Sequence, residues 1–145
     1  MLTFRLGFHQ ATPERAQELI DAIKRQPDSC DTVWLTSMGY YPPYEQHVIY
    51  AEQWKPIAKM FHDAGIRVSM QIANTVWHRD WEQLLPENKN HFALGMLPKD
   101  GEAPYLVGHN GSKNMSCFCW RSMQFREYIN TVVAIYAERI QPYRL

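Results

Sequence analysis

The side chains best suited to binding follow the short extended stretches of this sequence. They carry amides, hydroxyls, imidazoles, a carboxylate or flat aromatic rings, and they are His9, Gln10, Ser37, Tyr40, Tyr41, Asn74, Trp77, His78, Asp80, Asn110 and Trp120. Sugar hydroxyls need converging hydrogen-bond donors and acceptors, and the apolar faces of sugar rings stack on Trp or Tyr. If the fold brings these residues together, they predict a carbohydrate-binding surface.

Each residue also has a structural interpretation. Taken alone, His9 is more often a hydrogen-bonded structural histidine than a catalyst. Trp77 and Trp81 are four residues apart and could form the buried face of a short helix. His78 and Asp80 could be an exposed, solvated pair. Only the shared position of these residues after predicted strands favours a functional interpretation.

Metal and cofactor sites are not predicted. His9, His78 and His109 lack the HxH or HExxH spacing of common metal sites. The two cysteines of "SCFCW" have no second Cys pair and no close His pair to complete a zinc site. A small metal-dependent hydrolase that uses His and Asp is therefore the weakest function considered.

Composition argues against several partners and locations. Fifteen Lys and Arg residues balance fifteen Asp and Glu residues without a long run of either sign, so neither a nucleic-acid surface nor a polybasic membrane patch is expected. No stretch has the roughly 20 apolar residues of a membrane span. The start "MLTFRLGFHQ" lacks the features of a signal peptide, and three cysteines do not suggest a disulfide framework. A cytoplasmic protein is the simplest expectation.

Three strands must position the candidate residues. Apolar alternation or β-branched runs predict them over residues 2–8, 32–37 and 67–73. A long segment, roughly 74–121, has no sustained pattern, although it could include a hairpin around Asp100-Gly101. A further strand is expected to begin at Tyr143.

Three helices are predicted between and after these strands. The first begins with Thr12 as N-cap and Pro13 at the first helical position. The second is expected to start near Trp54, which places Pro56 in its first turn; the alternative is a longer helix that contains the proline. The third runs from about residue 122 to 140, with apolar side chains at helical spacing.

The order β-α-β-α-β-(long loop)-α predicts an α/β fold with parallel strands. A doubly wound sheet needs strands that are apolar throughout. Here the first strand places Leu2, Phe4 and Leu6 on one side and Thr3 and Arg5 on the other, which favours a barrel. Because a (β/α)8 (TIM) barrel takes about 250 residues, residues 1–145 are expected to be a single domain with about three βα units, the N-terminal portion of an incomplete barrel.

Two segments resemble a known group of barrels. "EQWKPIAKMFHDAGIRV" is similar to the second helix and third strand of glycoside-hydrolase-like barrels of the retaining clan that includes β-galactosidases. "CWRSMQFREYINTVVAIYAERI" resembles the C-x-N-S-P-x-F-R-x-Y pattern before the third helix of that clan. The matching residues are Cys119, Ser122, Phe125, Arg126 and Tyr128. Arg121 and Met123 depart from the pattern, where Asn and Pro are usual.

The resemblance implies a substrate-binding role without catalysis. In that clan the acid/base follows the fourth strand and the nucleophile follows the seventh, and both positions would fall beyond Leu145. Retaining hydrolysis needs two carboxylates roughly 5–5.5 Å apart. The chain would then be the carbohydrate-binding wall of a glycoside hydrolase and inactive alone. The alternative is a stand-alone module that binds carbohydrate or protein.

Self-association is also expected. In a part of a barrel the first strand would have an open edge, and the inner face would lack its opposite wall. Such a sheet favours pairing with another copy, so we expect a homo-oligomer that covers it.

Overall fold

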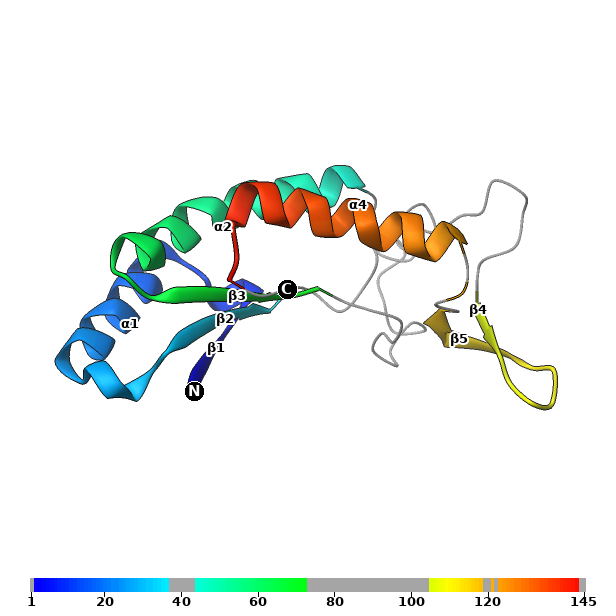
Figure 1. The fold of residues 1–145 in the computed structure, drawn as a ribbon, viewed down its shortest axis with the longest axis horizontal. Coiled ribbons are helices and arrows are strands. Elements are labelled where there is room, and N and C mark those ends of the chain that lie inside the picture. Colours follow the sequence, from blue (N-terminus) through cyan, green and yellow to red (C-terminus); the bar gives the residue numbers. More distant parts are fainter. Residues whose placement is uncertain (1, 37–43, 73–104, 119–120, 122, 144–145) are drawn as a thin grey trace. The chain divides into compact units, whose positions relative to one another are not determined.

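The computed structural model describes residues 2–36, 44–72, 105–118, 121 and 123–143 (Figure 1). The elements in chain order are β1 (Thr3–Gly7), η1 (Phe8–Gln10), α1 (Pro13–Arg25), η2 (Pro27–Ser29), β2 (Thr32–Thr36), α2 (Tyr44–Asp63), β3 (Arg67–Gln71), β4 (Tyr105–Val107), β5 (Lys113–Phe118) and α4 (Met123–Ile140). They fall into two compact units. The sheet unit holds β1–β3, α1, most of α2 and the last half of α4; the hairpin unit holds β4, β5, the start of α2 and the first half of α4.

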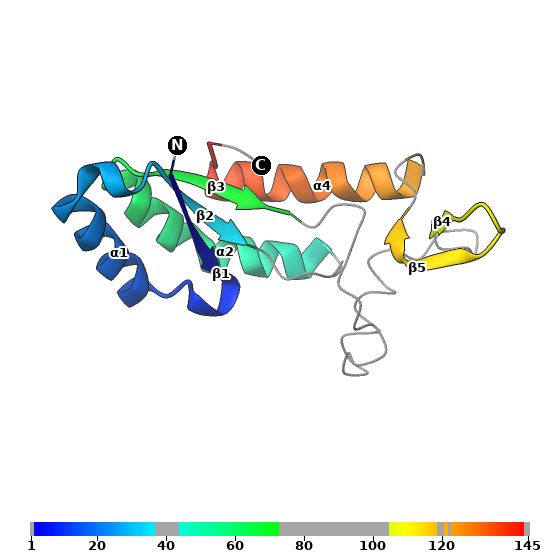
Figure 2. The same cartoon turned by 90° about the horizontal axis from the view of Figure 1, so that it is seen from below.

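The sheet of the first unit is parallel, with strand order β1-β2-β3. Each connection therefore moves one strand further in the same direction. Because such crossovers are right-handed, successive helices fall on the same face of the sheet, and Figures 1 and 2 show α1 and α2 on one side. The predicted α/β fold with three βα units and parallel strands is confirmed. Strands β1, β2 and β3 follow one another across the sheet in chain order. A doubly wound sheet instead has a point at which the strand order reverses, and these three strands show none.

The core of the sheet unit lies between the strands and these helices. The strands contribute apolar side chains that are almost fully buried, namely Leu6, Val33, Leu35, Val68 and Met70. Leu2 and Phe4, expected on the same side, are instead 56% and 38% exposed. β1 is the end strand of the described sheet and has a strand neighbour on one side only. Alternation therefore predicted the burial of Leu6 correctly but overestimated that of Leu2 and Phe4.

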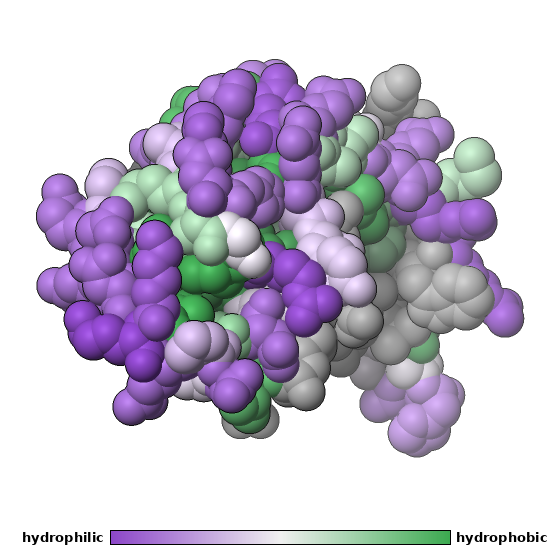
Figure 3. All heavy atoms as spheres, turned by 60° about the vertical axis from the view of Figure 1, so that its left-hand side comes forward, coloured by the Kyte–Doolittle hydropathy of each residue, from purple (hydrophilic) through white to green (hydrophobic). Residues whose placement is uncertain are grey.

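Helix α1 follows its local signals. The Oγ1 atom of Thr12 accepts a hydrogen bond from the backbone N–H of Arg15 at 3.2 Å, which confirms the predicted N-cap. Its predicted apolar face is buried and consists of Ala16, Leu19, Ile20 and Ile23. The outer faces are polar, and Figure 3 shows hydrophilic residues over most of this side of the molecule with apolar ones between them.

Helix α2 corrects the preferred sequence interpretation. It begins at Tyr44 rather than near Trp54, and Pro56 lies inside it. The buried positions continue at helical spacing upstream of the proline, at His47, Ala51 and Trp54. Proline in a helix interior costs about 3 kcal/mol, whereas each large buried side chain contributes about 1.5–3 kcal/mol. Burial along the whole helix therefore outweighs the penalty of one proline.

Helix α4 and the residues after it return the chain to the sheet. The predicted helix is confirmed, with Tyr136 and Ile140 buried in the sheet unit. The backbone N–H of Tyr143 donates to the carbonyl oxygen of Val68 in β3 at 2.6 Å. The guanidinium of Arg67 lies 5.1 Å from the centroid of the Tyr143 ring. Tyr143 is a bend rather than a strand residue, and residues 144–145 lie outside the described part.

The hairpin unit contains an antiparallel pair, β4 and β5. The N–H of Gly108 donates to the carbonyl oxygen of Ser112 at 2.9 Å, and Gly111 has a φ of +78°, a conformation that glycine adopts without strain. The segment expected to be a long loop is thus partly regular. Asp100 and Gly101, where a hairpin was expected, lie outside the described residues.

Candidate functional site

One face of the sheet carries none of the described helices (Figure 2). Alternation places on it every second residue of each strand, and the strand register aligns these in rows. The rows are Thr3–Thr32–Arg67, Arg5–Trp34–Ser69 and Gly7–Thr36–Gln71. We call these nine residues the open face. Its hydroxyl, amide, guanidinium and indole groups contrast with the aliphatic residues of the opposite side.

The middle row of the open face pairs a cation with an aromatic ring. The guanidinium carbon of Arg5 lies 6.0 Å from the centroid of the Trp34 ring. This separation is at the limit for a cation–π contact, which holds a guanidinium over a ring face. Trp34 is only partly buried, although it lies in the central strand. The row therefore offers both a stacking surface and a positive charge.

A hollow lies at the carboxyl end of β1. Of the described residues, Arg5, Gly7, His9 and Gln10 line it, and its volume is about 420 Å³. The chain turns directly from β1 into η1, and the Oε1 atom of Gln10 accepts a hydrogen bond from the N–H of Gly7 at 3.4 Å. This contact brings η1 back over the end of its own strand. The carboxyl ends of parallel strands are where α/β barrels place their binding groups.

Glycine at position 7 contributes to the space in this hollow. A Cβ atom there would lie 3.5 Å from the Oε1 atom of Gln10 and 3.8 Å from the Oγ1 atom of Thr36, both ordinary contact distances. A methyl group would thus fit without a clash, in a strand position that faces the hollow. The absence of a side chain at Gly7 enlarges the hollow, while the backbone conformation at this position does not require glycine.

Three of the sequence-predicted site residues lie in the described part. The structure brings His9 and Gln10 together in the hollow beside Arg5. Asn110 lies in the turn of the hairpin unit, where its Oδ1 atom accepts hydrogen bonds from the backbone N–H of Ser112 at 3.1 Å and from its hydroxyl at 2.6 Å. That geometry gives Asn110 a local role in closing the turn.

The other predicted residues lie outside the described part of the chain and stay predictions. They are Ser37, Tyr40, Tyr41, Asn74, Trp77, His78, Asp80 and Trp120. Conversely, Arg5, Gly7 and Trp34 belong to the site but were not predicted as site residues. The signal that could have found them is the alternation of β1 and β2, which places all three opposite the core.

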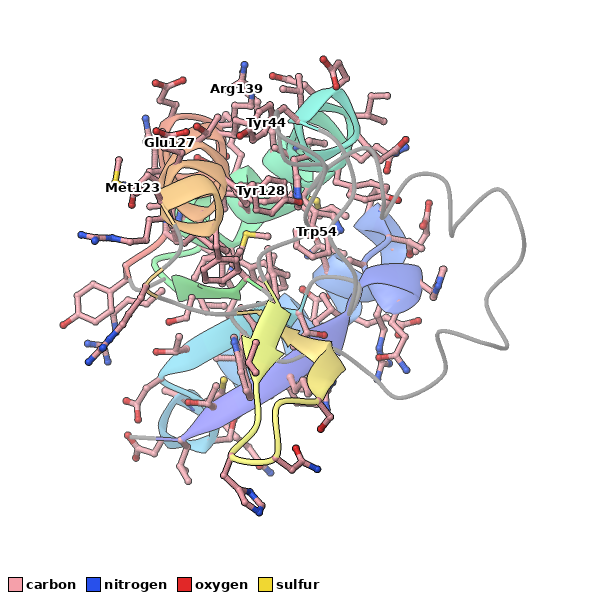
Figure 4. The ribbon with its side chains drawn as sticks, turned by 90° about the vertical axis from the view of Figure 1, so that its right-hand side faces the viewer. Tyr44, Trp54, Met123, Glu127, Tyr128 and Arg139 are labelled. Carbon is pink, nitrogen blue, oxygen red and sulfur yellow. The ribbon has the colours of Figure 1, made fainter. Side chains whose placement is uncertain are left out.

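A second polar group, in the hairpin unit, was also missed. The Nε2 atom of His47 in α2 lies 2.8 Å from the Oη atom of Tyr128 in α4. The ring of Tyr44 stacks on that of Tyr128 with centroids 5.4 Å apart, and Figure 4 labels both tyrosines. Burial lowers the pKa of His47 from 6.5 to about 4, so the imidazole is neutral at pH 7. His47 and Tyr128 are 6% and 2% exposed, which suits a contact that holds two helices together.

Metal and membrane features are absent from the described residues. They include no group of three or more His, Cys, Asp or Glu side chains placed to bind an ion. His109 is exposed in the hairpin turn. None of the described helices is long and apolar enough to cross a membrane.

The chemistry available in the described part of the hollow suits the recognition of polar groups. It offers N–H donors, an amide oxygen and a neighbouring indole ring, and no carboxylate is among its described lining residues. No family model, curated protein or solved structure matches the chain.

Proposed function

We propose that this chain forms a carbohydrate-binding wall of a glycoside-hydrolase-like (β/α)8 barrel of the retaining, β-galactosidase-type clan. The observation that carries the proposal is the hollow at the carboxyl end of β1, where His9 and Gln10 lie beside Arg5 on the open face. Barrel enzymes bind their substrates at this end of the strands. The strand order β1-β2-β3 is the order in which such a barrel is built.

The side chains suit a sugar. An imidazole and a primary amide supply both donors and acceptors, which sugar hydroxyls require in pairs. Trp34 adds an aromatic surface on the same face, two residues before the carboxyl end of β2. Sugar rings present apolar C–H faces to such surfaces. The same elements also serve the alternative, a stand-alone module that binds carbohydrate or protein.

Binding without hydrolysis is the expected behaviour. Retaining hydrolysis needs two carboxylates across the scissile bond, and none lines the described part of the hollow. The resemblance in the sequence assigns both carboxylates to later strands. The expected homo-oligomer over the open sheet stays a prediction, which light scattering over a concentration series can check.

Calorimetric titration with galacto- and gluco-oligosaccharides tests the proposal. We expect saturable binding that weakens about tenfold in Gln10→Ala, because a site built to hydrogen-bond a hydroxyl loses roughly 1–2 kcal/mol with one partner. Trp34→Ala should weaken binding by about tenfold as well. Gln53→Ala is the matched control for Gln10→Ala, since Gln53 is exposed on α2. Circular dichroism checks that each variant is folded.

Three results would contradict the proposal. Absence of binding to every sugar would leave only the protein-binding form of the alternative. Sugar binding that neither Gln10→Ala nor Trp34→Ala changes would place the site elsewhere. Release of reducing sugar by the purified 145-residue chain would contradict a wall without catalytic carboxylates.

A further inference from the structure

We propose that the hollow at the end of β1 recognises a carboxylate group. If the proposed function holds, on which the identity of the ligand as a sugar rests, the ligand is an acidic sugar that carries a hexuronate. The residues that carry this inference are Arg5, Gly7, His9 and Gln10, together with the Trp34 ring.

The charge of Arg5 has no carboxylate partner among the described residues. The open face carries two arginines, Arg5 and Arg67. The Nη2 atom of Arg67 lies 3.7 Å from the Oδ1 atom of Asp31, which balances its charge. Arg5 instead faces the ring of Trp34. A cation at the edge of a hollow, without an anion of its own among the described residues, favours an anionic ligand.

The contact with Trp34 suits this role. A guanidinium over an aromatic ring is held by its flat face, while the N–H groups in its plane stay available as donors. Those donors match the two oxygens of a carboxylate, and such charge-assisted bonds are about twice as strong as neutral ones. Arg5 is also exposed, so a ligand can reach it.

The remaining lining fits the rest of a uronate. The volume of about 420 Å³ lies within the roughly 300–1,000 Å³ of small-molecule sites. Gly7 leaves space beside Arg5, and His9 and Gln10 carry groups that hydrogen-bond hydroxyls. No acidic residue among the described lining opposes a carboxylate. The hollow thus combines the guanidinium of Arg5 with an imidazole and an amide, which suits the carboxylate and the hydroxyls of a hexuronate.

The test compares acidic and neutral sugars of the same length. We would titrate the chain with trigalacturonate and with the matching neutral galactotriose. We expect the acidic trisaccharide to bind about tenfold more tightly, a typical effect of one charge-assisted hydrogen bond. Arg5→Gln should remove this preference, so that the acidic and the neutral trisaccharide bind with equal affinity. Arg5→Lys should keep part of it. Sodium acetate, followed by chemical shifts of amide resonances, probes the carboxylate alone.

Two further variants control for net charge and for space. Arg25→Gln makes the same change of charge at an exposed position in the last turn of α1, and it should preserve the preference. Gly7→Ala adds one methyl group at ordinary contact distances. It should weaken both trisaccharides while the midpoint of urea unfolding stays at or above that of the wild type.

The outcomes separate this inference from the proposed function. Equal affinities for the two trisaccharides, unchanged by Arg5→Gln, would overturn the carboxylate site and leave the sugar-binding wall. A preference lost equally in Arg25→Gln would also overturn it, because the effect would be one of overall charge. Binding of acetate that Arg5→Gln abolishes, with no sugar bound, would support the carboxylate site and overturn the proposed function. Failure of every ligand would overturn both.

Discussion

The two faces of the parallel sheet differ although they come from the same strands. On the helix-covered face, Leu6, Leu35 and Met70 stand in one row across the sheet and are at most 2% exposed. On the open face, the adjacent row holds Arg5, Trp34 and Ser69. A shift of one residue along each strand thus separates dry aliphatic packing from polar groups and an aromatic ring.

This difference assigns separate tasks to the two faces. The covered face buries apolar area, the main favourable contribution to folding. On the open face, Arg5 is exposed and Trp34 is partly buried, so these two residues are available for recognition, whereas Thr32 and Thr36 are only 1% and 3% exposed. Mutations at matched positions should separate the two, with large effects on stability from one face and small effects from the other.

The largest effect is expected for Leu35→Ala. Leu35 is fully buried in the central strand between Leu6 and Met70, so its truncation should leave a cavity and lower the free energy of unfolding by about 2–5 kcal/mol. Urea unfolding measures this loss. Ser69→Ala, in the neighbouring row of the open face, should change it by less than about 0.5 kcal/mol. Equal losses in the two variants would break the contrast between the faces.

An intermediate effect is expected from acid, through a buried polar pair. Burial lowers the pKa of His47 to about 4 in the folded chain, from its ordinary value of 6.5 in the unfolded one. Between these values the unfolded chain binds more protons, so the free energy of unfolding falls as the pH falls from about 6.5 towards 4. The loss should reach up to about 3 kcal/mol, at 1.36 kcal/mol per pKa unit.

Urea unfolding at pH 7.5, 5.5 and 4.5 measures this dependence on pH. His47→Gln keeps a hydrogen-bonding group beside Tyr128 but cannot titrate, so this part of the pH dependence should disappear. His62→Gln, exposed near the end of α2, should behave like the wild type. If the free energy of unfolding of His47→Gln falls with pH as steeply as that of the wild type, another group is responsible for the pH dependence.

The smallest effect is expected for Arg5→Gln. An exposed cation–π contact is worth about 0.5–1 kcal/mol, so the free energy of unfolding should fall by no more than that. The same urea titration measures it. A loss comparable to that of Leu35→Ala would mean that Arg5 supports the fold, and its proposed part in binding would then be difficult to separate from stability.

Local signals predicted the parts of the fold whose causes are local. The N-cap of α1, its apolar spacing and its proline all lie within a few residues of each other, and the structure confirms them. The start of α2 was missed because Pro56 is a local penalty, whereas the reason to continue upstream is not local. His47 joins the buried face through Tyr128, 81 residues further along the chain.

In the candidate site, too, local signals predicted some residues and missed the one whose position depends on tertiary structure. His9 and Gln10 were predicted because they directly follow a strand. Arg5 was not, because alternation shows only that it faces away from the core. Its place in a hollow depends on the turn of η1, with the Gln10 amide bonded to Gly7, and on the neighbouring strand that supplies Trp34. Pairing across strands is a tertiary property that a single stretch of sequence does not contain.

The hydrogen bond from the N–H of Tyr143 to the carbonyl oxygen of Val68 ties the residues after α4 back to β3, so the chain leaves the sheet unit after β3 and returns to it in the second half of α4. The entropy of closing a loop grows only with the logarithm of its length, so doubling the length costs about 0.6 kcal/mol. Insertions between β3 and α4 would therefore change the stability of the parallel sheet very little, whereas α4 itself contributes Tyr136 and Ile140 to the core of the sheet unit. The architecture lets the chain between β3 and α4 vary in length while the hollow at the end of β1 stays in place.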